Sequence, residues 1–486
     1  MNKEIFKLQP NAVWKHFYNL TQIPRPSKFE KAVVDYVVKF AKDNNLEVIT
    51  DKVGNVIIRK QATPGMENKK GIILQGHLDM VPQKNSDKKH DFEKDPIEAF
   101  IDGEWVTANG TTLGADNGIG VAAALAVLED KSLKHGLIEA LLTIDEETGM
   151  TGAFGLEPGI LKGDILMNLD SEDEGELYVG CAGGLDANIE LSFESVPVPA
   201  SMYFAKISVT GLKGGHSGMD ISSGRANAIK LLFRFLYNLE KEMSLMLVSF
   251  DGGSLRNAIP REAFATIAIP ADKRTNLENL IKTFLTIYKG EFSLVEPDLS
   301  ITSQQADAAP NAIDPKSQAV IIRSIYGSPN GVIRMSDSMA GLVETSTNLA
   351  RVYTNNGKFL AQCLLRSSVD SSKDALAQKI ASVFELAGAK VGFSGGYPGW
   401  KPNMESPILK TMREVYNNKF GKIPEIKAIH AGLECGLLGG VYPNLDMISF
   451  GPTIRYPHSP DEKVNIASVQ KFWDYLVEVL KNVPSK

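Results

Sequence analysis

The hydrophobic positions of this chain form short apolar runs that alternate with segments of helical period. Apolar runs of this length are typical of buried strands, and they occupy residues 71–75, 137–144, 164–169 and 445–450. The segments between them, such as residues 121–128, favour helices. Strands that alternate with helices predict an α/β fold built on a largely parallel sheet.

The pattern changes in the middle of the chain. Residues 11–60 predict two helices and a two-stranded ribbon that turns at residues 53–55. Between about residues 184 and 396 an order of strand, helix, two strands, helix and strand is followed by a second, similar set that begins with its helix. The alternation of the first part resumes at residue 397. We therefore expect a discontinuous α/β domain, residues 1–183 and 397–486, interrupted by an α+β insert of two similar halves at residues 184–396.

Composition and charge narrow the class of protein. A chain of 486 residues with 43% hydrophobic and 23% charged residues is typical of a globular protein with two domains. The net charge of −6 gives no basic surface for nucleic acid or for an anionic membrane. No apolar run reaches the length of a membrane span or a signal peptide, so we expect a cytoplasmic protein. The three cysteines, Cys181, Cys363 and Cys435, form no close pair, and we expect inert buried thiols.

A histidine and a carboxylate two residues apart follow the apolar run at residues 71–75. Because side chains alternate along a strand, His77 and Asp79 point the same way. This is how a metal ligand and the carboxylate that orients it are presented. A lone pair of this kind is also what an ordinary hydrogen-bonded strand end provides.

Further acidic residues and a histidine lie at the ends of other apolar runs or before a helix. They are Asp116, the pair Glu146 and Glu147, Asp170, and His458. Strand ends of an open α/β sheet converge at one edge. His458 is far along the chain from the others, so the C-terminal segment must return to the first domain for one site to form. These residues predict a metal centre.

The types of residue predict which metal it holds. Zinc accepts imidazole and carboxylate, whereas a closed structural zinc site uses mostly thiolates. Two histidines and three carboxylates exceed one tetrahedral ion. They suit two ions that share a bridging carboxylate.

Five motifs resemble, in order, those of the di-zinc aminoacylase and carboxypeptidase family. They are Gly-His-Leu-Asp-Met-Val-Pro at residues 76–82, Gly-Ala-Asp-Asn-Gly-Ile-Gly at 114–120, Asp-Glu-Glu-Thr-Gly-Met at 145–150, Asn-Leu-Asp-Ser-Glu at 168–172 and Tyr-Pro-His-Ser-Pro-Asp-Glu at 456–462. The resemblance is greatest to the aminoacylhistidine dipeptidase branch and spans nearly the whole chain. It implies a discontinuous zinc-peptidase catalytic domain, whose mixed central sheet is flanked by helices, and makes the insert a mobile lid.

The resemblance also implies roles for individual residues. It implies that two metal ions are bound by His77, Asp116, Glu147, Asp170 and His458, and that Asp116 bridges them. We expect zinc, for which cobalt or manganese could substitute. Asp79 orients His77, and Glu146 acts as the general base. The spacing alone does not decide which of Glu146 and Glu147 is base and which is ligand. The peptide bond between Asp116 and Asn117 is expected to be cis.

In the insert the resemblance implies three residues that hold the substrate. His216, in the Gly-Gly-His-Ser-Gly run at residues 214–218, matches a lid histidine that holds the tetrahedral oxyanion. Asn257 and Arg366 resemble residues that hold the substrate, and an arginine matches a C-terminal carboxylate in a bidentate manner. Lone Asn and Arg residues are also commonly structural. His430 ends a predicted strand, and we interpret it as structural.

The function implied is metal-dependent hydrolysis of unblocked dipeptides, including Xaa-His and beta-alanyl-histidine. An N-acyl amino acid deacylase or a tripeptidase would need the same di-metal site, and these alternatives stay open. A binding protein that has lost catalysis should lack a ligand or the base, yet all seven positions of the centre are filled. A homodimer is also open, because relatives with a single-unit lid supply the histidine across a dimer, whereas a doubled lid could supply His216 within one chain.

Overall fold

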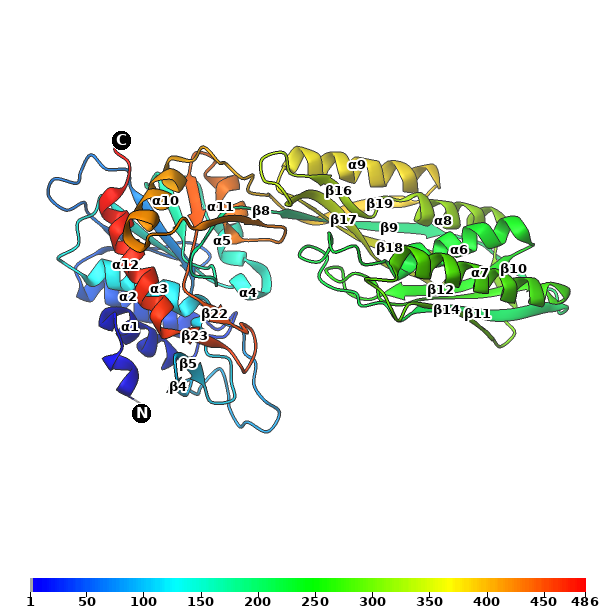
Figure 1. Cartoon of the computed structure of the whole chain (residues 1–486), viewed down its shortest axis with the longest axis horizontal. Coiled ribbons are helices and arrows are strands. Elements are labelled where there is room, and N and C mark those ends of the chain that lie inside the picture. The colour runs from blue at the N-terminus through cyan, green and yellow to red at the C-terminus, as the bar shows by residue number, and fades with distance from the viewer. Residues whose placement is uncertain (1–2) are drawn as a thin grey trace. The chain divides into compact units, whose positions relative to one another are not determined.

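The computed structural model describes residues 3–486, and the chain forms two compact units. The first unit comprises the chain up to Gly180 together with Trp400–Ala428 and Leu433–Lys486. The second unit comprises Cys181–Gly399 and the short segment Ile429–Gly432. Figure 1 shows the elements of each unit, with the second unit coloured from green to yellow. Among the described residues, no helix has both the length and the apolar character needed to cross a membrane.

The first unit is built on an eight-stranded mixed sheet in the order β1-β2-β6-β3-β7-β21-β8-β20. Its strands are β1 Glu47–Thr50, β2 Val56–Lys60, β3 Ile72–His77, β6 Ile138–Thr143, β7 Ile165–Asn168, β8 Glu176–Cys181, β20 Glu425–Ile429 and β21 Asp446–Ser449. Every residue of β3, β6 and β7 is buried. β3 lies parallel to both β6 and β7, whereas β2 lies antiparallel to β6. The predicted buried strands and the mixed sheet are confirmed.

Helices flank this sheet. They are α1 Asn11–Thr21, α2 Lys31–Asp43, α3 Ala115–Glu129, α4 Glu146–Gly149, α5 Thr151–Gly155, α10 Pro407–Phe420, α11 Glu434–Val441 and α12 Ile466–Asn482, with the 3-10 helix η1 at Lys3–Lys7. α3 is apolar on all sides and packs on β3, β6 and α1. α10 begins where the Ser406 side chain accepts the N–H of Leu409, and it ends at Gly421, whose φ is 67°. Caps of this kind are local signals, so the residues at its two ends determine the limits of α10.

A small antiparallel sheet of the first unit is absent from the sequence-based expectation. Its order is β22-β23-β5-β4, with β4 Ala99–Asp102, β5 Trp105–Ala108, β22 Ile454–Arg455 and β23 Lys463–Asn465. These strands are too short to produce a clear alternation of apolar and polar residues. The pairing of β23 with β5 holds the turn that carries His458.

The second unit is built on a long antiparallel sheet in the order β14-β11-β13-β12-β17-β18-β9-β19, with β16 also paired to β17. Its strands are β9 Gly183–Ser192, β11 Met202–Thr210, β12 Met246–Gly253, β13 Ala263–Pro270, β14 Ser300–Gln305, β16 Gly331–Met335, β17 Val343–Asn355, β18 Lys358–Ser367 and β19 Lys390–Tyr397. A separate pair is formed by β10 Ser195–Pro197 and β15 Asn311–Ile313.

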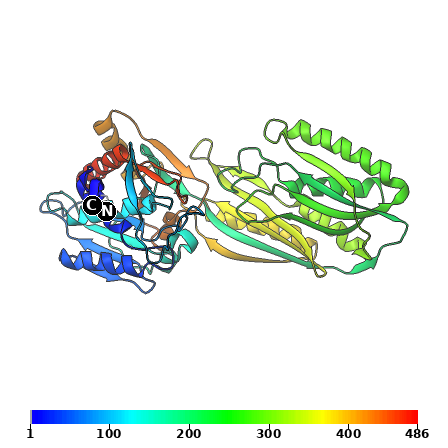
Figure 2. The same cartoon turned by 90° about the horizontal axis from the view of Figure 1, so that it is seen from below.

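Four helices pack in a row against one face of this sheet (Figures 1 and 2). They are α6 Ala228–Glu242, α7 Arg274–Phe292, α8 Pro315–Gly327 and α9 Asp370–Leu386, with a 3-10 turn η2 at Ala271–Lys273. Buried aromatic side chains, among them Phe233, Phe250 and Phe359, fill the space between helices and sheet.

The order strand, helix, strand, strand, helix, strand occurs twice in the second unit. The first set is β11-α6-β12-β13-α7-β14, and the second is β9-α8-β17-β18-α9-β19. The first set is inserted between β9 and α8 of the second, and the two sets join in the sheet where β12 pairs with β17. The sequence showed no strand at residues 183–192, so the expected second set lacked its first strand.

Candidate metal centre

Three of the predicted residues meet at the carboxyl ends of two neighbouring parallel strands. His77 is the last residue of β3, and Asp170 follows β7, which pairs with β3. His77 Nε2 lies 3.1 Å from Asp116 Oδ1 and 3.4 Å from Asp170 Oδ1. Asp116 is in the first turn of α3, where Asp116 and Asn117 have non-helical dihedral angles, and the peptide bond between them is cis as expected.

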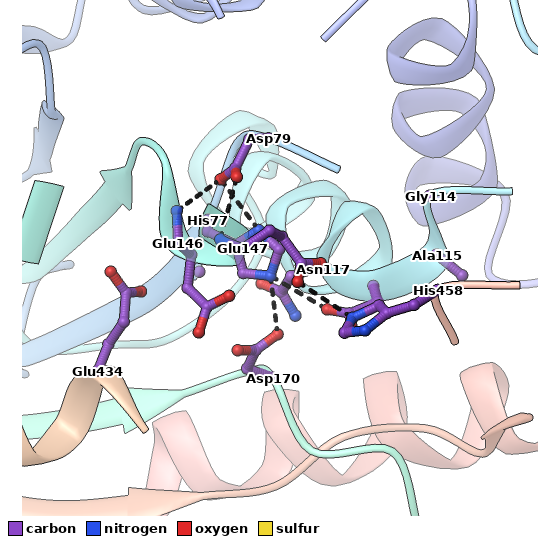
Figure 3. Close-up of polar contacts among 12 residues, drawn as sticks. His77, Asp79, Gly114, Ala115, Asn117, Glu146, Glu147, Asp170, Glu434 and His458 are labelled. Atoms are coloured by element: carbon purple, nitrogen blue, oxygen red, sulfur yellow. Dashed lines mark hydrogen bonds and ion pairs between the residues drawn. The ribbon is translucent and has the colours of Figure 1, made fainter. Parts of the chain in front are cut away.

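The second oxygen of Asp116 faces the other histidine (Figure 3). His458 Nε2 lies 3.1 Å from Asp116 Oδ2 and 3.1 Å from Glu147 Oε2. One carboxylate thus stands between two groups of donor atoms, His77 with Asp170 on one side and Glu147 with His458 on the other. This is the arrangement that a carboxylate bridging two cations requires.

Carboxylate oxygens that have no hydrogen-bond partner also suggest that the centre binds cations. Glu147 Oε1 and Asp170 Oδ1 are buried and have no hydrogen-bond partner. Burial raises the pKa of Asp170 to about 7, and the negative charge of Asp116 adds to the effect. Buried carboxylates crowded in this way need a positive charge. Imidazole and carboxylate are the donors that zinc and related divalent ions accept.

Asp79 is fully buried beside His77, and its contacts extend beyond that histidine. Its Oδ1 lies 3.3 Å from His77 Nδ1. It also accepts the Ser27 hydroxyl at 2.8 Å and the N–H groups of Glu146 and Glu147 at 3.1 and 3.2 Å. Burial raises the pKa of Asp79, but the bonds to His77 and the other donors outweigh it and lower the pKa to about 2. Asp79 therefore orients both the histidine and the start of α4.

The two glutamates at the start of α4 differ in their contacts. Glu147 reaches His458, whereas Glu146 has no such contact and lies between Glu434 and Asp170 in the view of Figure 3. Burial raises the pKa of Glu146 well above its usual value, and the charges of Asp170, Glu434 and Glu147 act in the same direction. Both glutamates lie within reach of His77 as possible donors to a metal ion, and Glu147 also reaches His458.

Glu434 is a buried acid near the centre to which the sequence analysis gave no role. It begins α11, and its Oε2 accepts Gln75 Nε2 at 2.6 Å and the Thr143 hydroxyl at 2.8 Å. Burial raises the pKa of Glu434 to about 7. The only signal in the sequence was an acidic residue at the start of a short apolar helix.

His216 and Arg366 of the second unit lie next to each other. His216 Nδ1 accepts the N–H groups of Gly218 and Met219 at 3.2 and 3.1 Å, which places the ring proton on Nε2. Nε2 lies 3.5 Å from Arg366 Nη2. Burial and the charge of Arg366 lower the pKa of His216, so the ring is neutral.

The other residues of this region have different surroundings. Asn257 has an exposed side chain, and its carbonyl accepts the N–H of Ser217 at 2.8 Å. His430 belongs to the second unit and is buried, with Nε2 2.7 Å from the Ser346 hydroxyl. Burial and the charge of Arg366 lower the pKa of His430 to about 3. The hydrogen bond to Ser346 agrees with the interpretation of His430 as a structural residue. Its charged neighbour, Arg366, is one of the residues predicted to contact the substrate.

Comparison with known proteins identifies the family. Residues 73–482 match the model of Peptidase family M20/M25/M40. The chain belongs to this family. This peptidase is 50% identical over 483 residues, 99% of its own chain and 100% of the relative, to the cytosol non-specific dipeptidase of Escherichia coli (strain K12). The resemblance found in the five motifs is therefore confirmed. The prediction that the chain is a metal-dependent hydrolase is also confirmed.

Solved structures agree with this assignment. The crystal structure of aminoacylhistidine dipeptidase from Vibrio alginolyticus is 51% identical, and each chain covers 100% of the other with a TM-score of 0.96. Aminopeptidase PepT from Bacillus cereus is 17% identical over 98% of this peptidase and 99% of its own chain, with a TM-score of 0.57. At that identity the second likeness concerns the fold alone.

Proposed function

We propose that this peptidase hydrolyses the peptide bond of unblocked dipeptides, with histidine-terminated dipeptides and beta-alanyl-histidine among its substrates. The proposal rests on one arrangement, a carboxylate shared by two imidazole-containing groups of donors. It draws its substrate class from a dipeptidase that is 50% identical over its whole length. The relative's name also supports a cytoplasmic location. The partners that we propose for this site are dipeptide substrates.

The residues of the centre would hold two ions, which we take to be zinc, with cobalt or manganese as substitutes. His77 and Asp170 would hold one ion, Glu147 and His458 the other, and Asp116 both. When bound, such ions lower the pKa of water and polarise a carbonyl group. Asp79 fixes the ring of His77 in the orientation that metal binding requires.

Glu146 carries the proton in this proposal. It takes a proton from the attacking water and passes it to the leaving amine, as a general base and then a general acid. A carboxyl group beside the ligands is within the class of side chains that perform both steps. Its position next to Glu147 on α4 supports this role, and we assign the ligand role to Glu147.

The residues of the second unit recognise the substrate. His216 presents a neutral ring with a proton on Nε2, which suits a donor to an oxyanion. Arg366 pairs with the C-terminal carboxylate of the dipeptide, and Asn257 provides a further polar contact. We propose that residues 184–396 act as a lid on a catalytic domain formed by residues 1–183 and 397–486.

The test is a panel of substrates for the zinc-loaded protein. Unblocked dipeptides, including histidine-terminated ones, are compared with the matching N-acetyl amino acids and tripeptides by kcat/KM. We expect only the unblocked dipeptides to be hydrolysed efficiently. Faster hydrolysis of the N-acetyl compounds would favour a deacylase, and faster hydrolysis of tripeptides would favour a tripeptidase.

A further inference from the structure

The start of α3, which carries Asp116, has no capping residue of its own. The N-cap position is Gly114, which has no side chain to accept the first N–H groups of the helix. Buried N–H groups at a helix start need an acceptor, and a side chain at the N-cap usually provides it. The acceptor here comes from the other end of the chain.

The carboxylate of Glu462 accepts four successive backbone N–H groups. Oε2 accepts those of Leu113 and Gly114 at 2.7 and 2.9 Å, and Oε1 accepts those of Ala115 and Asp116 at 2.7 and 3.2 Å. Glu462 is 1% exposed and lies 346 residues from Asp116 along the chain. Burial raises the pKa of Glu462 to about 7, while the N–H groups favour its ionised form.

Arg25 holds the same loop as a hydrogen-bond donor, whereas Glu462 holds it as an acceptor. Its guanidinium is 1% exposed and donates to the carbonyl groups of Leu78, Asp79 and Gly114 at 2.9, 2.8 and 2.5 Å. A Cβ at Gly114 would lie 2.5 Å from Arg25 Nη2, and the φ of Gly114 is 72°, so only glycine fits there. The Asp116 loop is thus tied to the end of β3, which carries His77.

Glu462 also shares a short turn with His458. Its N–H donates to the carbonyl of Ser459 at 2.9 Å, and its carbonyl accepts the Thr107 hydroxyl at 2.8 Å. One residue therefore connects the loop of Asp116 to the turn of His458. His77 and Asp170 need no such connection, because adjacent strands of the sheet already hold them together.

We infer that Glu462 is a positioning residue for the metal centre, and that the position formed by Asp116, Glu147 and His458 depends on it more than the position of His77 does. This inference rests on the proposed metal ligands. Substitution of Glu462 by glutamine replaces one oxygen with an NH₂ group that faces backbone N–H donors. The His458 position then loses more affinity for its ion than the His77 position does, because Glu462 supports both Asp116 and the turn of His458, whereas the His77 position depends on it through Asp116 alone.

The experiment counts zinc ions in the intact protein by native mass spectrometry and by competition with a chelator. The wild type should bind two ions. In Glu462→Gln one of the two ions should bind at least ~10-fold less tightly, the usual cost of losing a group that orients a ligand, and the other should be weakened less. The matched control is Asp461→Asn, which removes the same charge from an exposed position of the same turn and should bind as the wild type does.

A second variant keeps the test decisive if Glu462→Gln does not fold. Thr107→Val removes only the hydroxyl that donates to the Glu462 carbonyl, and it should weaken the same ion by a smaller factor. Two ions bound with wild-type affinity in folded Glu462→Gln, or in Thr107→Val when Glu462→Gln does not fold, would overturn the inference and leave the dipeptidase proposal standing. Equal weakening of both ions would also overturn it. A wild type that binds fewer than two ions would refute the metal centre itself.

Discussion

The groups proposed for catalysis and those proposed to hold the substrate are supported in different ways. In the first unit, Asp79 and Glu462 each accept several hydrogen bonds, most of them about 3 Å or shorter. In the second unit, the contacts of the Arg366 guanidinium to Ser217, Tyr397 and His216 are all 3.5 Å. A guanidinium has five donors, so Arg366 retains most of its capacity for a ligand. The hydrogen bonds of Asp79 and Glu462 are therefore formed within the folded protein, whereas most donors of Arg366 are available to a substrate.

The two regions also differ in charge. The metal centre brings together carboxylates in excess of any cation. Around Arg366 the neighbours include the rings of His216 and His430 and the hydroxyl of Tyr397, and Asp186 is the carboxylate within electrostatic range. This difference agrees with the proposal that the first region receives cations and the second receives an anion. The following predictions test this division, from the largest expected effect to the smallest.

Glu146→Ala should leave both metal ions bound and lower kcat by at least ~10²-fold, the usual contribution of a positioned acid or base. Metal content and single-turnover rates on the same preparation provide the measurement. Glu147→Ala is the matched control, and it should lose metal. If Glu146→Ala loses metal and Glu147→Ala does not, the roles of the two residues must be exchanged.

His216→Ala should lower kcat by about 10²-fold or more with little change in KM, because an oxyanion exists only near the transition state. The alanine variant also removes the acceptor for the N–H groups of Gly218 and Met219. His216→Asn can keep that acceptor while losing the Nε2 proton. Recovery of activity in His216→Asn would show that the ring only supports the loop.

Arg366→Ala should raise KM for free dipeptides by about 10- to 100-fold, since a hydrogen bond to a charged group contributes about 1.5–3 kcal/mol. Carboxyl-amidated dipeptides offer no anion and should be affected much less. Steady-state kinetics on matched free and amidated substrates provide the comparison. An equal effect on both would exclude a carboxylate contact.

His430 gives the smallest effect, on stability. Its pKa of about 3 in the folded protein lies below the unfolded value of about 6.5. Between these values the unfolded state binds more protons, so the contribution of His430 to stability decreases as the pH falls. The difference in Tm between the wild type and His430→Gln should therefore be smaller at pH 5 than at pH 7.5. A difference that does not change with pH would mean that the imidazole is not held neutral.

Local signals in the sequence predict much of the fold and of the candidate centre. The limits of α10 follow from Ser406, Pro407 and Gly421, which act within one turn of the helix ends. The apolar runs that became β3, β6 and β7 place His77, Glu146 and Asp170 near one edge, because parallel strands have only one carboxyl edge. The contacts among His77, Asp116 and His458 agree with that expectation, and their role as ligands remains a prediction.

Other features depend on contacts that no local pattern records. Arg25 and Glu462 hold the Asp116 loop through hydrogen bonds to its backbone. Every residue has these backbone groups, so the sequence does not show which of them are bonded. The strands β22 and β23 are two and three residues long, and they form only because β5 offers a partner from a distant part of the chain. Glu434 is buried by the fold as a whole. A single sequence gives no measure of such burial.

The turn that carries His458 and Glu462 also determines when the centre can form during biosynthesis. The ribosome makes the chain from its N-terminus, so His77, Asp116, Glu147 and Asp170 are all present long before this turn. Until the turn is made, the Asp116 loop lacks its acceptor and the second position lacks its histidine. If His458 is a ligand as proposed, a nascent or truncated chain that ends before it has no complete centre and should not hydrolyse dipeptides.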